Sequence, residues 1–237
     1  MTRGRSGGSV VLLSGGMDSA TCLAIAAARD PPVHALSVRY GQRHVREVGS
    51  ARALARYYRV ARHVELELPL GPWLDSALTH RDRSLPRARV GRRGIPTTYV
   101  PARNAILLSI ALGYAESHGL DRIYLGVNAI DYSGYPDCRP EFLRAFERMA
   151  RRATRQGVTG GPPIRVMAPL LRRSKASIVR LGDRLGVPWE LTWSCYAGGR
   201  RPCGLCDACR LRALGFAGAG HPDPALATLR SKPPQAG

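Results

Sequence analysis

Near the N-terminus, six consecutive residues combine groups that bind a phosphorylated ligand: Ser14-Gly15-Gly16-Met17-Asp18-Ser19. An apolar run, Ser9 to Leu13, precedes them and an amphipathic segment follows. Adjacent glycines permit positive φ and close backbone approach, while the following helix offers free N–H groups and the positive end of its dipole. A glycine-rich turn can be purely structural. Strand, turn, acid, hydroxyls and helix in this order favour a phosphate or pyrophosphate site, where Asp18 would hold Mg²⁺.

The turn is not the phosphate loop of kinase-type enzymes, because G-x-x-x-x-G-K-[ST] occurs nowhere in the chain. It resembles the S-G-G-x-D-S turn of the PP-loop ATP pyrophosphatases, which split ATP between its α and β phosphates and adenylate a substrate oxygen. The resemblance implies that Asp18, Ser19 and Lys175 act in catalysis. The ATP-binding residues that it implies are Leu13, Ser14, Gly15, Gly16, Met17, Asp18, Ser19, Ala20, Thr21, Arg103 and Lys175.

Four cysteines near the C-terminus have the spacing of a metal site. Cys195, Cys203, Cys206 and Cys209 follow the pattern C-x7-C-x2-C-x2-C. Four thiolates match a tetrahedral Zn²⁺ site with Zn–S distances of about 2.3 Å. A redox C-x-x-C pair would leave two cysteines unexplained, and an iron–sulfur cluster also fits thiolate chemistry. We expect a structural zinc ion, because four sulfur ligands leave no position for a reacting water.

A second polar cluster, Asp131 to Arg139, follows the apolar run Arg122 to Val127. Open α/β sheets bind their ligands beyond the carboxyl ends of their strands. Tyrosine rings can stack on a planar heterocycle, and a carboxylate can accept hydrogen bonds from the N1–H and amino group of a guanine-like edge. A turn with surface tyrosines is the plainer alternative. The candidate substrate-binding residues are Asp131, Tyr132, Ser133, Tyr135, Asp137 and Arg139.

Two cysteines remain outside the metal pattern. Cys22 lies on the apolar face of the first amphipathic segment, so we expect it in the core. Cys138 lies within the polar cluster, as a neighbour of the substrate site. A covalent role for Cys138 is a minor alternative.

Short aliphatic runs alternate with longer amphipathic segments, which is typical of a βαβ series. We predict an α/β fold: a Rossmann-like, doubly wound, mostly parallel sheet of the adenine nucleotide alpha hydrolase type, with a C-terminal zinc-binding helical or knuckle region. Residues 1–8 are expected to be flexible, 9–190 to form the nucleotide-binding domain, 191–216 the zinc region, and 217–237 a disordered tail. The expected strands are Ser9–Leu13, Val33–Val38, His63–Leu68, Arg122–Val127 and Ile164–Met167; the expected helices are Ala20–Arg29, His44–Tyr58, Arg103–His118, Pro140–Thr154 and Ser174–Leu185.

Five segments together resemble the 7-cyano-7-deazaguanine synthases, with similarity from about Val10 to Arg212: "SGGMDSAT", "IPTTYVPARN", "GVNAIDYSGYPDCRPEF", "APLLRRSKASIVRLG" and "LTWSCYAGGRRPCGLCDAC". The resemblance implies ATP-dependent conversion of 7-carboxy-7-deazaguanine and ammonia to the nitrile, through an adenylated carboxylate, an amide and an adenylated amide, with release of AMP and pyrophosphate. It also implies Zn²⁺ on the four cysteines, Mg²⁺ with ATP, and a homodimer. The family usually has Gln where Met17 stands; we expect activity to persist, because the backbone there meets the phosphate.

The composition is that of a basic globular protein: 237 residues with a net charge of +19, and only two lysines among 36 basic residues. No apolar run approaches the about 18 residues that cross a bilayer, and Ser9 to Leu13 is too short for a signal peptide, so we expect a cytoplasmic protein with no membrane partner. The charge keeps two rivals open: a tRNA-modifying PP-loop enzyme, and a zinc-ribbon adaptor that binds nucleic acid through Arg81 to Arg93. An Arg-rich cleft also attracts ATP, pyrophosphate and a carboxylated base, so no nucleic-acid partner is expected.

Overall fold

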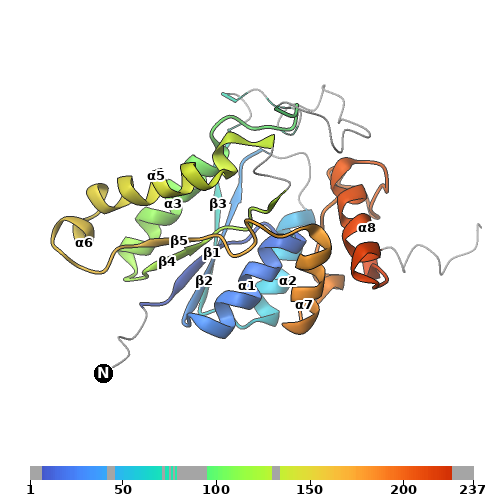
Figure 1. Cartoon of the computed structure of the whole chain (residues 1–237), viewed down its shortest axis with the longest axis horizontal. Helices are drawn as coiled ribbons and strands as arrows, with labels where there is room; N and C mark the ends of the chain where they lie inside the picture. Colours follow the sequence, from blue (N-terminus) through green and yellow to red (C-terminus); the bar gives the residue numbers. More distant parts are fainter. Residues whose placement is uncertain are drawn as a thin grey trace, which may run out of the picture.

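Within the described part of the chain, five strands pair in parallel in the order β3-β2-β1-β4-β5 (Figure 1). This computed structural model describes residues 7–41, 46–70, 73–74, 76, 78, 95–129 and 134–225. The strands are β1 (Ser9–Leu12), β2 (Val33–Arg39), β3 (Arg62–Glu67), β4 (Arg122–Tyr124) and β5 (Arg165–Met167). The helices are α1 (Met17–Arg29), α2 (Arg46–Tyr57), α3 (Arg103–Ser117), η1 (Pro136–Cys138), α5 (Pro140–Ala153), α6 (Arg155–Val158), α7 (Lys175–Arg184), η2 (Trp189–Leu191) and α8 (Asp207–Ala219).

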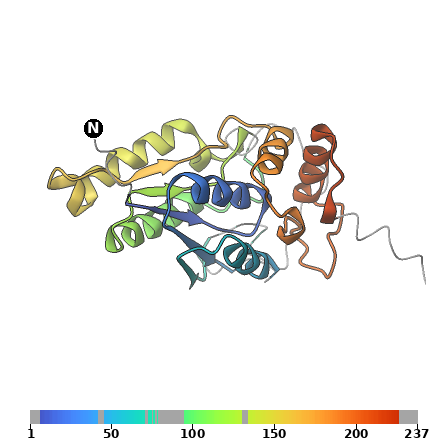
Figure 2. The same cartoon turned by 90° about the horizontal axis from the view of Figure 1, so that it is seen from below.

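The central strand β1 is buried along its whole length, because helices cover both faces of the sheet. Val10 and Leu12 pack with α3 and α5 on one face, whereas Val11 packs with α1, α2 and α7 on the other. Figure 1 shows the sheet between these two helical layers. At one end of the molecule α8 lies next to α7, and α6 lies at the opposite end (Figure 2). The predicted α/β class and the parallel sheet are confirmed.

The direction of sheet growth reverses at β1. The chain runs from β1 to β2 to β3 on one side, and β4 and then β5 extend the sheet on the other. In open parallel sheets, ligands bind at the carboxyl ends of the strands where the order reverses. The turn after β1 and the segment after β4 therefore meet at the edge of the sheet where a ligand is expected.

Some predicted boundaries shift. Helix α1 begins at Met17, three residues before the predicted start, because Gly16 is its extended N-cap. The predicted strand Arg122–Val127 keeps ladder pairing only to Tyr124, and the buried residues that follow run on toward the site. Among the described residues, none of the helices combines the length and apolar character that a membrane span requires.

The predicted tail is wrong for residues 217–225. Helix α8 continues to Ala219 and ends at Gly220, which adopts the left-handed conformation with φ of 78°. Beyond it, Asp223 is buried and accepts two hydrogen bonds of 2.9 Å from Arg212. Residues 226–237 lie outside the described residues, as do residues 1–6 of the predicted flexible N-terminus. Gly7 donates its backbone N–H to Asp121 Oδ2 at 3.1 Å.

Candidate active site

The turn between β1 and α1 needs glycine because the neighbouring backbone approaches closely. Gly15 has a φ of +86°, and a Cβ there would lie 2.3 Å from the carbonyl oxygen of Glu47. Gly126, just beyond β4, approaches from the other side: its Cβ would lie 3.0 Å from the backbone nitrogen of Ser19. A larger residue at Gly15 would therefore clash with the backbone of α2, and one at Gly126 with the start of α1.

Hydroxyl groups line the same turn. Ser14 Oγ and Ser19 Oγ are 3.1 Å apart, and Ser19 Oγ donates to the carbonyl oxygen of Gly16 at 3.0 Å. Gly16 is the N-cap of α1 and makes no side-chain hydrogen bond to the helix. The positive end of the helix dipole is therefore not capped by a side chain at this position. This arrangement supports the predicted phosphate or pyrophosphate site.

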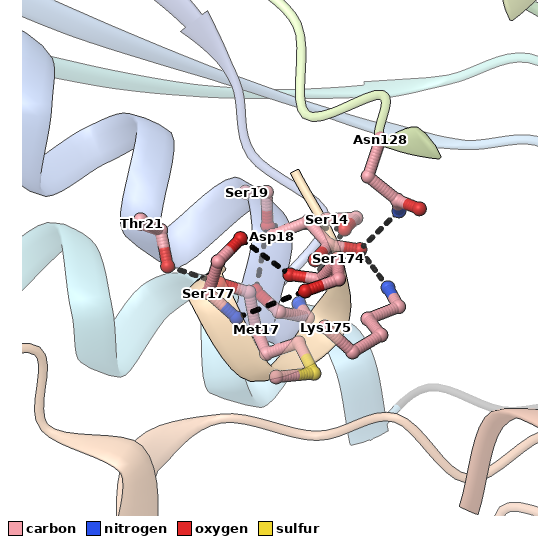
Figure 3. A network of polar contacts seen from close by, with 10 residues as sticks. Ser14, Met17, Asp18, Ser19, Thr21, Asn128, Ser174, Lys175 and Ser177 are labelled. Carbon is pink, nitrogen blue, oxygen red and sulfur yellow. Dashed lines mark hydrogen bonds and ion pairs between the residues drawn. The ribbon is translucent and has the colours of Figure 1, made fainter. Parts of the chain in front are cut away.

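Asp18 and Lys175 meet across the site, although 157 residues separate them in sequence. Lys175 Nζ donates to Asp18 Oδ2 at 2.5 Å, and Asn128 Nδ2 donates to the same oxygen at 3.3 Å (Figure 3). Lys175 is held there as the first residue of α7, which Ser174 caps by accepting the N–H of Ser177. The other carboxylate oxygen, Asp18 Oδ1, is buried, and none of the residues that the structure describes is hydrogen-bonded to it. A buried oxygen without a partner fits a cation ligand, so Asp18 suits the Mg²⁺ that accompanies ATP.

A cavity of about 280 Å³ opens at this edge of the sheet. Three predicted ATP-binding residues do not line it: Gly15 packs against α2, Ala20 lies in the core, and Thr21 Oγ1 donates to the carbonyl oxygen of Met17 at 2.8 Å. The predicted ATP-binding residues that do line it are Leu13, Ser14, Gly16, Met17, Asp18, Ser19, Arg103 and Lys175.

Residues from β2, α2 and α3 complete the wall. Arg103, the first residue of α3, donates to the Tyr40 hydroxyl at 3.5 Å, and its guanidinium lies 5.8 Å from the centre of the Tyr40 ring. Glu47 in the first turn of α2 lines the same cavity. Burial raises the pKa of Glu47 to about 7, against the opposing effect of the Arg103 guanidinium. The sequence did not single out Tyr40 or Glu47; their only signal is their place around the carboxyl end of β2.

The predicted substrate segment is divided by the structure. Tyr135 lines the cavity and its hydroxyl lies 2.9 Å from Thr98 Oγ1. Asp137 is buried, but its Oδ2 accepts the backbone N–H of Asn104 at 2.8 Å, so it holds η1 to the start of α3. Arg139 is exposed and lies outside the cavity wall. Asp131, Tyr132 and Ser133 lie outside the described residues.

The two remaining cysteines are both buried. Cys22 is fully buried in the core between α1 and the sheet, as predicted, and burial raises the pKa of its thiol. Cys138 lines the cavity, and its sulfur accepts a hydrogen bond from Asn104 Nδ2 at 3.1 Å.

The four cysteines of the metal pattern converge. Their Sγ atoms all lie within 4.8 Å of one another, and Cys203 and Cys209 are 4.0 Å apart. A tetrahedral site with Zn–S distances of about 2.3 Å has sulfur–sulfur separations of about 3.8 Å. The backbone N–H groups of Ala197 and Cys203 donate to Cys195 Sγ at 3.4 and 3.2 Å, and hydrogen bonds from Cys206 and Cys209 lower the pKa of Cys195. The cluster can hold a metal ion, as the spacing predicted.

Trp193 joins this cluster to the phosphate turn. Its backbone N–H donates to the carbonyl oxygen of Gly15 at 2.9 Å, and its ring nitrogen donates to the carbonyl oxygen of Cys195 at 2.9 Å. The Arg46 guanidinium lies 4.7 Å from the centre of the Trp193 ring. The segment that bears the metal ligands is therefore also hydrogen-bonded to the glycine turn between β1 and α1.

The strand order and the glycine turn at the point where it reverses place the chain among the open, parallel α/β proteins, which bind ligands at this edge of the sheet. The NMN synthetase of Francisella tularensis shares the fold, with a TM-score of 0.51 and 18% identity over 95% of this chain and 82% of that one. At the sequence level, residues 8–220 match the model of the family described as "Queuosine biosynthesis protein QueC". The chain belongs to this family.

The chain is similar over nearly its full length to curated proteins named 7-cyano-7-deazaguanine synthase. The chain is 57% identical to a 7-cyano-7-deazaguanine synthase of Anaeromyxobacter sp. (strain Fw109-5), over 92% of this chain and 95% of the relative. It is 58% identical to the enzyme of that name from Xanthomonas campestris pv. campestris (strain B100), over 91% of this chain and 96% of the relative. For the Nostoc punctiforme enzyme the identity is 50%, over 91% and 97%.

Proposed function

We propose that this protein is an ATP-dependent ligase that converts 7-carboxy-7-deazaguanine and ammonia to 7-cyano-7-deazaguanine. The observation that carries the proposal is the contact of Lys175 with Asp18 at the glycine turn, 2.5 Å, in a chain 57% identical to an enzyme of that name. The turn supplies backbone N–H groups, and Lys175 supplies a positive charge where pyrophosphate departs.

The chemistry follows from the change in the substrate. A carboxylate must lose two oxygen atoms to become a nitrile, and each is a poor leaving group until it is adenylated. In the first half, the carboxylate attacks the α-phosphorus and pyrophosphate leaves; ammonia then displaces AMP and loses a proton, which gives the amide. In the second half, the amide oxygen attacks the α-phosphorus of a second ATP, and pyrophosphate and a proton leave. Loss of AMP with a second proton then gives the nitrile. One site therefore uses ATP twice.

The residues act by position and charge. Lys175 and the N–H groups at the start of α1 stabilise charge that develops on the departing pyrophosphate. Because ammonia is itself a nucleophile, no acyl-enzyme is required at Cys138. The roles of Ser19 and Arg103 toward ATP, and of Asp131, Tyr132, Ser133 and Tyr135 toward the base, stay predictions.

Two metal ions belong to this proposal. Asp18 would hold Mg²⁺, which supplies charge neutralisation of the polyphosphate when bound. Cys195, Cys203, Cys206 and Cys209 would hold Zn²⁺ in a structural role, since four sulfur ligands fill a tetrahedral site. Reduced thiolates at such a site favour a cytoplasmic location. The family resemblance supports a homodimer.

The test is a direct assay. The protein is incubated with ATP, ammonium and 7-carboxy-7-deazaguanine, and the nitrile and AMP are quantified; two AMP per nitrile are expected. Asp18→Ala should abolish AMP formation with an unchanged circular dichroism spectrum. Lys175→Met should lower kcat by about 10²–10³, the usual cost of one donor to a developing charge. Arg184→Met, at an exposed position on the same helix, is the matched control.

Two outcomes would overturn the proposal. Near-normal turnover of the Asp18→Ala variant would remove the phosphate-site assignment. Absence of nitrile together with tRNA-dependent AMP release would favour a tRNA-modifying PP-loop enzyme, for which the net charge of +19 would be an RNA-binding feature.

A further inference from the structure

Most charged side chains that line the cavity are paired inside the protein. Asp18 accepts hydrogen bonds from Lys175 and Asn128. Arg212 is bound in a bidentate way to Asp223, at 2.9 Å for both contacts. The charged residues of the described cavity wall are Asp18, Glu47, Arg103, Lys175 and Arg212. Of the two acidic residues in this described wall, Asp18 is paired with Lys175 and Glu47 is not.

Glu47 lies next to the phosphate turn. Its carbonyl oxygen faces Gly15, where a Cβ would approach to 2.3 Å. Within the described part of the chain, no hydrogen bond or ion pair engages its side chain. The Arg103 guanidinium nevertheless stabilises its negative charge, in opposition to the burial that raises its pKa to about 7. A half-buried carboxylate without a donor is costly, so the site gains when a ligand supplies donors.

The proposed substrate has donors of the right kind. A guanine-type ring presents its N1–H and its amino group side by side, and the two oxygens of one carboxylate can accept both. Asp137, one of the carboxylates in the expected substrate segment, instead accepts the backbone N–H of Asn104 at 2.8 Å. Resting on the proposed function, we propose that Glu47 is a specificity-determining residue, whose carboxylate accepts the N1–H and amino hydrogen bonds of the deazaguanine ring.

The experiment compares two substrates in two proteins. Wild type and Glu47→Gln are assayed with 7-carboxy-7-deazaguanine and with its analogue that lacks the 2-amino group, at saturating ATP and ammonium. A hydrogen bond to a charged group contributes a factor of about 10–100 in binding, so wild-type kcat/KM should fall by that factor for the analogue. In Glu47→Gln the kcat/KM values for the two substrates should lie within about threefold of each other, because no carboxylate is left to accept the hydrogen bond of the amino group. Its KM for ATP and ammonium should be unchanged.

Glu190→Gln, an exposed glutamate on η2, serves as the control and should keep the wild-type preference. A preference that persists in Glu47→Gln would overturn the inference, as would a defect confined to the KM for ammonium, which would make Glu47 an ammonium site. If Glu47→Gln does not fold, wild type still decides, because equal use of both substrates would exclude an acceptor for the amino group. Failure of the proposed function is distinct: wild type would then form nitrile from neither substrate.

Discussion

The Asp223→Ala substitution should destabilise the fold by about 3–5 kcal/mol, the usual cost of leaving one member of a buried ion pair alone. The side chains of Arg212 and Asp223 are only 5% and 4% exposed. Arg212 donates twice to Asp223 at 2.9 Å, once to Thr192 Oγ1 at 2.6 Å and once to the carbonyl oxygen of Trp189 at 3.2 Å. Without Asp223, the buried guanidinium keeps only neutral partners.

The comparison with a double variant separates the ion pair from packing. Replacing a whole buried pair with apolar groups costs less than removing one partner, because no charge is left unpaired. Arg212→Met combined with Asp223→Ala should therefore be more stable than Asp223→Ala alone by at least about 1 kcal/mol. Glu67→Ala removes an exposed carboxylate 3.6 Å from Arg39 and should cost less than about 1 kcal/mol.

Urea unfolding followed by circular dichroism measures these differences, and thermal unfolding gives a second reading. For a chain of this size, about 3–5 kcal/mol corresponds to a decrease in Tm of about 6–20 °C. A loss below about 1 kcal/mol for Asp223→Ala would refute the reasoning. The segment after Ala219 would then behave as the tail that composition suggested.

Gly15→Ala should raise the KM for ATP and cost about 1–3 kcal/mol in unfolding free energy, because φ is +86° and the added Cβ meets Glu47. Gly113→Ala, inside α3 with nothing within 4 Å, should stabilise by about 0.5–1 kcal/mol, and similar effects of the two changes would contradict the geometry. Elemental analysis should find one zinc ion per chain, and iron or no metal in the wild-type protein would refute the assignment. Removal of the zinc by a chelator, or the Cys203→Ser substitution, should lower the Tm. Either change should also weaken ATP binding measured by calorimetry, because Trp193 connects the cysteine cluster to the glycine turn. Cys138→Ser should keep kcat within about tenfold, since a hydroxyl can accept from Asn104; a loss above about 10³ in the same assay would indicate a covalent step.

Local patterns allowed much of this fold and part of the site to be predicted. The alternation of aliphatic runs and amphipathic segments gave the parallel sheet, because a central strand such as Ser9–Leu12 is buried on both faces and so is continuously apolar. The glycine turn and the cysteine cluster could be predicted as binding sites because the groups of each lie close together in the sequence. Lys175 was found through the resemblance to a superfamily, since spacing alone does not connect it to Asp18.

Side chains whose partners lie far along the chain could not be predicted. Asp137 was chosen as a base-binding carboxylate because it follows a strand, yet its partner Asn104 is 33 residues away in sequence. Glu47 lies in the first turn of a correctly predicted helix, but which face of α2 meets the cavity depends on its packing against Gly15. Such contacts are set by how helices pack on the sheet, and no local pattern records them.

Glycines in α8 explain why the predicted tail boundary was wrong, because they let this helix pack closely against α7. Composition rich in Ala, Gly and Pro suggested disorder from residue 217, because glycine weakens isolated helices. In the structure, a Cβ at Gly215 would lie 3.0 Å from Lys175 Cβ, and one at Gly218 would lie 3.1 Å from Ala176 Cβ. The small residues therefore let α8 approach the first turn of α7, where Lys175 begins its reach to Asp18. Gly218, the first glycine of the predicted tail, thus packs beside Ala176, next to the lysine whose own Cβ faces Gly215.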